Sequence, residues 1–290
     1  MTLETTETKF VEASGKKYAY RWIGKDAGNT PLVLMQHFTG TMDSWDPLVV
    51  NGLAKNRTVI VFNNVGVASS SGTTPDNVAQ MAIDARDFIS ALGLEKVDLL
   101  GYSLGGMVAQ QLIANHPGVA RRIVLVGTGP RGGEEHLLKV LDDARSQRDL
   151  PDPRLDLFFT KSEASRAAGL AFLERARART KDRDPDASQE TTNAQAKALI
   201  SWCATKDSNN SILGAIRQQV LIVNGSDDTM LPADNSYFMF QHLQDAQLIL
   251  YPDAGHGSCF SMPGFSSPTP SCFWGRRAPL RKVEANYERQ

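Results

Sequence analysis

The chain has 290 residues, 41% of them hydrophobic, which is enough for one large core with or without an insertion. Its formal net charge of −1 argues against nucleic acid or an acidic membrane surface as a partner. Three cysteines, an odd number without metal-site spacing, favour a reduced, cytoplasmic protein. We expect no signal peptide, and no apolar run reaches the roughly 18 residues that span a membrane.

Short apolar runs alternate with helical patterns along most of the chain. Residues 9–13 and 16–24 look like an opening hairpin. Apolar residues recur at helical spacing from Val78 to Leu92 and predict a helix, with Thr74 expected as its cap and Pro75 in its first turn. Six buried strands are predicted at 31–37, 57–63, 96–102, 121–127, 218–225 and 246–252. This alternation predicts an α/β fold with a mostly parallel, doubly wound sheet.

Two segments break the alternation. Residues 131–210 carry helical patterns without a convincing strand, so we expect a helical cap insertion between the core segments 1–130 and 211–257. Residues 258–290 are rich in proline and serine and have no sustained period, which predicts an irregular tail. The tail is either a divergent covering of the sheet or the product of a coding-frame change, and both interpretations stay open.

Residues 101–106, GYSLGG, lie where a predicted strand becomes a predicted helix. Gly-x-Ser-x-Gly in that position is typical of a nucleophile elbow, whose glycines let neighbouring chains pass close to a strained serine. The elbow would place the Ser103 hydroxyl beside a helix N-terminus, which favours negative charge. The alternative is that Ser103 only caps the helix. The strand before it and the apolar helix after it favour a nucleophile.

A nucleophilic serine needs a base, and the base needs a carboxylate that orients it. In this architecture the acid and then the histidine follow later strands. Asp227 and Asp228 both follow the strand at 218–225, and His256 follows the strand at 246–252. Of the five histidines, only His256 comes after the acid, in a glycine-flanked loop. The order therefore predicts a triad of Ser103, one of the two aspartates, and His256.

Three stretches together resemble the α/β-hydrolase superfamily, in the branch that groups simple esterases with cofactor-free haloperoxidase-like proteins. They are GYSLGG, the Gly-x-x-Asp-x-x-x-Pro run of Gly225, Asp228 and Pro232, and YPDAGHG, and the resemblance covers about residues 8–257. It implies the α/β-hydrolase fold, with Ser103 as nucleophile, Asp228 as acid and His256 as base. It also implies that no metal or organic cofactor is needed.

The resemblance further implies an oxyanion hole built from the backbone N–H groups of Phe38 and Leu104. Many relatives carry His-Gly before the first donor, whereas this chain has Gln36-His37. A glycine-like torsion would be strained at His37, so we expect the loop conformation to differ there. His37, Tyr102 and Trp202 are candidates for the substrate pocket.

These features predict a serine hydrolase that cleaves carboxylic esters or lactones through an acyl-enzyme, acting on a small-molecule substrate. A cofactor-free haloperoxidase or perhydrolase and an acyltransferase would use the same triad, so both stay open. A small-molecule receptor on a hydrolase fold is an alternative of another class, which the intact Ser103, Asp228 and His256 disfavour. The oligomeric state, the acyl group and the alcohol group are not predicted.

Overall fold

The computed structural model describes residues 1–25, 28–132 and 152–261. Its strands are β1 (Lys9–Ala13), β2 (Lys16–Ile23), β3 (Leu32–Met35), β4 (Val59–Phe62), β5 (Val97–Tyr102), β6 (Ala120–Val126), β7 (Gln219–Gly225) and β8 (Ala246–Tyr251). They form one 8-stranded sheet in the order β1-β2-β4-β3-β5-β6-β7-β8. The β1–β2 and β2–β4 pairs are antiparallel, and every later pair is parallel. The predicted hairpin and mostly parallel sheet are confirmed.

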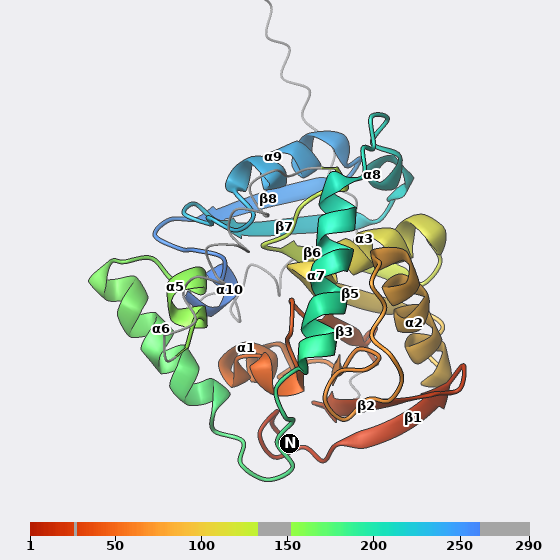
Figure 1. Ribbon diagram of the computed structural model, residues 1–290, viewed down its shortest axis with the longest axis vertical. Helices are drawn as coiled ribbons and strands as arrows, with labels where there is room; N and C mark the ends of the chain where they lie inside the picture. Colours follow the sequence, from red (N-terminus) through yellow and green to blue (C-terminus); the bar gives the residue numbers. More distant parts are fainter. Residues whose placement is uncertain (26–27, 133–151, 262–290) are drawn as a thin grey trace, which may run out of the picture.

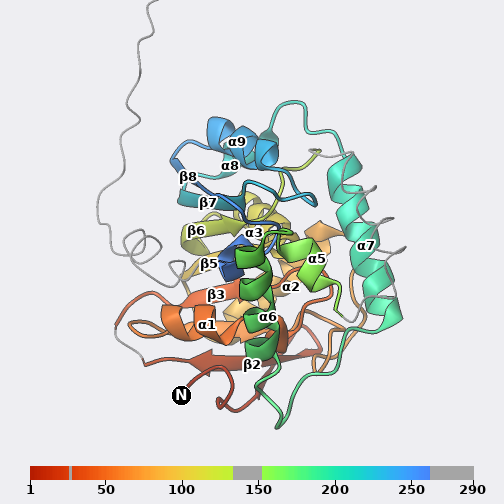
Figure 2. The same ribbon diagram turned by 90° about the vertical axis from the view of Figure 1, so that its left-hand side faces the viewer.

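Helices cover both faces of this sheet (Figures 1 and 2). They are the short 3₁₀ helix η1 (Met42–Ser44) and the α-helices α1 (Pro47–Leu53), α2 (Val78–Ala91), α3 (Leu104–Asn115), α5 (Arg154–Phe158), α6 (Glu163–Ala176), α7 (Gln189–Ala204), α8 (Ser211–Ala215), α9 (Ala233–His242) and α10 (Ser258–Ser261). In Figure 2 the strands are stacked from β2 at the bottom to β8 at the top, and α7 lies along the right-hand side.

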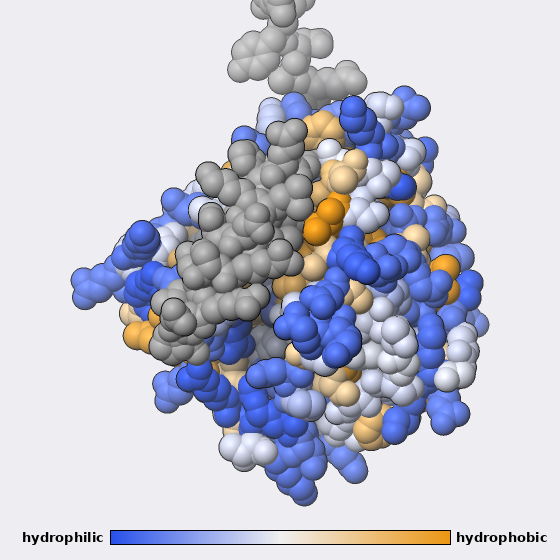
Figure 3. Space-filling view, in the orientation of Figure 1, coloured by the Kyte–Doolittle hydropathy of each residue, from blue (hydrophilic) through white to orange (hydrophobic). Residues whose placement is uncertain are grey.

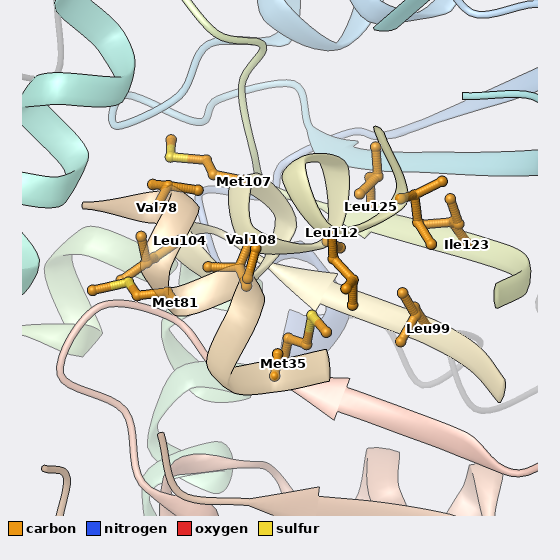
Figure 4. Close-up of a cluster of buried hydrophobic side chains, with 14 of the residues drawn as sticks. Met35, Val78, Met81, Leu99, Leu104, Met107, Val108, Leu112, Ile123 and Leu125 are labelled. Atoms are coloured by element: carbon orange, nitrogen blue, oxygen red, sulfur yellow. The ribbon is translucent and has the colours of Figure 1, made fainter. Parts of the chain in front are cut away.

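The alternation of side chains along the strands produces two hydrophobic cores. Val33 and Met35 of β3 point into one core, with residues of α2, α3, α7 and α8. Leu32 and Leu34 point into the other, with residues of α1, α5, α6 and α10. Figure 4 shows the first core, where α2 and α3 pack their apolar side chains together. Because both faces are covered, β3, β4 and β5 are buried along their whole length, and their one charged residue, Asp98 of β5, is paired with Arg57 and Arg121.

The start of α2 differs from the expected one. Thr74 does not cap the helix, because its hydroxyl donates to the carbonyl of Val65, at 3.1 Å. The cap is Asn77, whose side-chain oxygen accepts from the backbone N–H of Gln80, at 2.8 Å. The helix therefore begins at Val78, three residues after Pro75. The prediction of a Thr74 cap is wrong because the preceding loop uses that hydroxyl.

Between β6 and β7, the described residues 152–218 form α5 to α8 and no strand. The part of the expected cap insertion at residues 133–151 lies outside the described residues. The first residues of the expected irregular tail instead form α10, where Phe260 stacks on Phe172 with ring centroids 4.6 Å apart. Residues 262–290 lie outside the described residues.

The described side chains on the face shown in Figure 3 are mostly hydrophilic. Among the helices that the structure describes, none combines the length and apolar character needed to cross a membrane.

Candidate active site

Ser103 occupies the turn between the end of β5 and the start of α3. Its φ of 54° and ψ of −118° lie in a region that residues with a side chain rarely adopt. Two hydrogen bonds hold the turn: Ser103 N–H donates to the Val126 carbonyl, at 2.9 Å, and the Thr128 hydroxyl donates to the Ser103 carbonyl, at 2.8 Å. The Ser103 side chain makes no capping hydrogen bond to α3. The capping alternative therefore lacks the contact that defines it.

The glycines of the turn are required by close backbone approach. A Cβ atom on Gly105 would lie 2.2 Å from the Met35 carbonyl oxygen, at the end of β3. A Cβ atom on Gly101 would lie 2.5 Å from the Gly105 carbonyl oxygen. Real Cβ atoms do not come so close to backbone, so only glycine fits at either position. The same packing puts the loop after β3 directly against the turn that carries Ser103.

Asp228 and His256 follow the ends of β7 and β8 and meet in a buried pair. His256 Nδ1 donates to Asp228 Oδ2 over 2.8 Å. Asp228 Oδ1 accepts from the backbone N–H groups of Met230 and Leu231, both at 2.9 Å, which fixes the carboxylate. Asp227 instead accepts a hydrogen bond from the hydroxyl of Ser226 in an exposed position. Because Nδ1 carries the shared proton, His256 Nε2 is the ring nitrogen left to act as a base.

The imidazole of His256 lies against the turn that carries Ser103. Its ring centroid is 5.4 Å from that of Tyr102, whose hydroxyl donates to the His256 carbonyl, at 3.3 Å. The backbone on either side of the ring is tied to the insertion: His256 N–H donates to the Leu157 carbonyl and Gly257 N–H to the Phe158 carbonyl. Among the described residues, the Ser103 hydroxyl has no hydrogen-bond partner. The hydrogen bond between a nucleophile and its base is commonly long without substrate and tightens only when substrate binds.

In the loop of residues 36–46, which we name the oxyanion loop, one backbone N–H has no acceptor among the described residues. Between residues 37 and 44, each backbone N–H donates a hydrogen bond to a described residue except that of Phe38. The backbone N–H of Leu104, the first residue of α3, also has no acceptor among the described residues, as expected at a helix start. The two candidate oxyanion donors are thus free to bind a ligand.

His37 does not adopt the glycine-like torsion that would be strained there. His37 is absent from the described non-glycine residues with positive φ, whereas Thr39 has a φ of 60°. His37 Nδ1 donates to the Phe38 carbonyl, at 2.7 Å, and the ring packs edge-on against Tyr102 and Phe158. Burial lowers the pKa of His37 to about 3, so the ring is neutral near pH 7. The positive φ of this loop therefore falls at Thr39, two positions after His37.

Of the other pocket candidates, Tyr102 is fully buried beside His256, and burial raises the pKa of its hydroxyl well above the ordinary value. Trp202 packs in the first core with Leu199 and Cys203, and its indole N–H donates to the Gly129 carbonyl, at 3.4 Å. The aromatic residues nearest the imidazole also include Phe158, with ring centroids 5.8 Å apart. The ring of Tyr102 contacts the rings of His37 and His256, whereas no described contact joins Trp202 to Ser103, Asp228 or His256.

Two supporting residues are absent from the sequence-based site. Gln36 bridges the oxyanion loop from within, because it donates to the Thr41 carbonyl and accepts from His37 N–H. Gln195 reaches the same loop from α7, where its side-chain oxygen accepts from Thr39 N–H. Gln36 stands where many relatives carry the histidine of His-Gly, and this departure is the signal in the sequence that marks it. No signal in the sequence marks Gln195 among the other polar residues of α7.

Within the residues that the structure describes, no three His, Cys, Asp or Glu side chains gather as metal ligands would.

Comparison with known proteins agrees with the fold. The α/β-hydrolase fold family matches residues 30–263. A solved α/β-hydrolase fold protein from Chitinophaga pinensis is 44% identical, with a TM-score of 0.85, over 94% of this chain and 96% of that one. The pimeloyl-[acyl-carrier protein] methyl ester esterase of Nitrosomonas europaea is 28% identical over 81% of this chain and 92% of its own length. The proline iminopeptidase PfmaB of Pestalotiopsis fici is 27% identical over 86% of this chain and 92% of its own length. The chain therefore belongs to the α/β-hydrolase family.

Proposed function

We propose that the protein is a serine hydrolase that cleaves carboxylic esters or lactones, with Ser103, His256 and Asp228 as its catalytic triad. The observation that carries the proposal is the buried 2.8 Å hydrogen bond between His256 Nδ1 and Asp228 Oδ2, beside a strained serine turn. Membership of a hydrolase family and a relative named as a methyl ester esterase support hydrolysis. The named substrates of the relatives differ, so the substrate is proposed only as a class.

In the proposed reaction, His256 Nε2 accepts the Ser103 hydroxyl proton while the oxygen attacks the carbonyl carbon. The carbonyl π electrons move to its oxygen, which the N–H groups of Phe38 and Leu104 then stabilise. When the tetrahedral intermediate collapses, the alcohol leaves and takes the proton from His256. Water then attacks the acyl-enzyme and gives a proton to His256, which returns it to the Ser103 oxygen as the free acid leaves. Asp228 keeps the imidazole in the required tautomer throughout.

We propose that the insertion, residues 131–210, acts as a cap over this site. Its support is the position of Phe158 in α5, which contacts the rings of His37, Tyr102 and His256. Apolar walls beside the triad suit the acyl or alcohol part of a small ester and exclude water from the reacting atoms.

The test is labelling with a fluorophosphonate, followed by peptide mapping. We expect the label on Ser103, and we expect Ser103→Ala to lower kcat/KM for a p-nitrophenyl ester by at least about 10⁴-fold without unfolding the protein. Ser226→Ala, which alters an exposed serine of the acid loop, should keep both labelling and turnover. Labelling elsewhere, or unchanged hydrolysis by Ser103→Ala, would refute the proposed function.

A further inference from the structure

The Phe38 N–H lies next to a peptide group that is held from both sides. The carbonyl of Phe38 accepts from His37 Nδ1 and from the Thr39 hydroxyl, each at 2.7 Å. On the other side, the N–H of Thr39 donates to Gln195 Oε1 over 2.6 Å. These three bonds fix the plane of the Phe38–Thr39 peptide, and so the direction of the neighbouring Phe38 N–H.

The oxyanion loop needs such support because its turn is strained. Thr39 has a φ of 60°, an uncommon conformation for a β-branched residue, which persists only where surrounding contacts impose it. The other donating N–H groups of residues 37–44 find their acceptors in residues 36–63 of the core. Gln195 is different because it comes from α7, within the insertion.

Gln195 is also costly to the fold. Its side chain is fully buried, and its Nε2 has no hydrogen-bond partner among the described residues. A buried donor without an acceptor destabilises a folded protein, because it has given up its hydrogen bonds to water. Stability alone therefore does not account for an amide here, whereas the contact of its oxygen with the oxyanion loop does.

We propose that Gln195 is a positioning residue for the oxyanion hole: through its hydrogen bond to the Thr39 N–H it orients the Phe38 N–H and so raises the rate of the acylation step. The inference rests on the proposed function and deepens it. Gln195 itself does not touch the reacting atoms; it acts through the peptide that it holds.

The test compares Gln195→Met, which keeps the length of the side chain and removes the acceptor, with Gln195→Asn, which keeps the amide but is too short to reach Thr39. For both we expect kcat for a p-nitrophenyl ester to fall about 10- to 100-fold while KM changes little, because a misdirected oxyanion donor weakens the transition state most. The rate of labelling by a fluorophosphonate should fall in parallel.

The matched control is Thr191→Val, one turn earlier on the same face of α7. The Thr191 hydroxyl donates to the Gly66 carbonyl, at 2.8 Å, so the variant loosens α7 without touching residues 37–44. Its kcat should stay close to that of the wild type. An equal loss in Thr191→Val, or wild-type kcat in either folded Gln195 variant, would overturn the positioning role. A wild-type protein that takes no label at Ser103 would instead overturn the proposed function.

Discussion

The turn at Ser103 and the oxyanion loop lie against each other but are held by different interactions. Residues 101–106 are fixed by steric fit, since Cβ atoms at Gly101 and Gly105 would clash with backbone. The oxyanion loop is fixed by a hydrogen bond that Gln36 donates within it and by one that Gln195, far along the chain, accepts from Thr39. Steric fit is local and rigid, whereas the loop depends on partners that can move. A change at Gly101 or Gly105 should therefore affect folding, whereas a change in the hydrogen bonds of the loop should affect turnover.

The largest expected effect is that of Gly105→Ala. The added methyl group would lie 2.2 Å from the Met35 carbonyl oxygen and 2.8 Å from that of Gln36, and neither backbone atom can move freely. We expect a loss of about 3 kcal/mol or more in the free energy of unfolding, measured by urea denaturation. Gly118→Ala is the matched control, because nothing lies within 4 Å of its Cβ position. Equal stability of the two variants would contradict a sterically fixed turn.

Gln36→Met should act mainly on turnover. It removes the bonds to the Thr41 carbonyl, at 2.5 Å, and from His37 N–H, at 2.9 Å. We expect kcat for a p-nitrophenyl ester to fall about tenfold or more, and stability to fall by only about 1–2 kcal/mol. Gln218→Met serves as the control for the same substitution, because the half-buried Gln218 donates to the Pro117 carbonyl and not to the oxyanion loop. If stability fell as far as in Gly105→Ala while kcat stayed unchanged, the contrast between turn and loop would be wrong.

The buried His37 should make the stability of the protein depend on pH. Its pKa is lowered to about 3 in the folded protein, from an ordinary value of 6.5. Between these values the unfolded state binds more protons than the folded state, so stability falls as pH falls, by at most about 1.4 kcal/mol per pH unit from this group. His37→Phe should therefore show a shallower loss of unfolding free energy between pH 6.5 and pH 4, from urea titrations at each pH. Identical slopes in both proteins would show that His37 is not held neutral.

The smallest effect is expected for a pair that joins the insertion to the oxyanion loop. Arg175 of α6 donates to both oxygens of the buried Asp46, at 2.9 and 2.7 Å. Since Arg175 is partly exposed, we expect Arg175→Gln to cost about 1 kcal/mol of unfolding free energy. Arg177→Gln, on a more exposed arginine of the same segment, should cost less. A larger loss of unfolding free energy in Arg177→Gln than in Arg175→Gln would contradict the role of Arg175 in anchoring the loop.

The same contrast explains what could be predicted from the sequence. The strands are readable because each is a short apolar run, and the turn at Ser103 is readable because its glycines are adjacent in the chain. The contact between Thr39 and Gln195 spans 156 positions, and a glutamine on a polar helix carries no mark of its partner. The start of α2 was misplaced for a similar reason, since the Thr74 hydroxyl is used by Val65 rather than by the helix. Steric constraints among residues adjacent in the chain can be predicted from the sequence, whereas hydrogen bonds between distant segments cannot.

The backbone bonds from His256 and Gly257 to the carbonyls of Leu157 and Phe158 have a consequence for engineering. They mean that α5 supports the segment that carries the imidazole, in addition to covering it. Exchanging residues 131–210 for the corresponding segment of another hydrolase would therefore also replace the two carbonyls that hold the backbone around the imidazole. A successful chimera would have to reproduce those two carbonyl positions before any change in substrate preference could be measured.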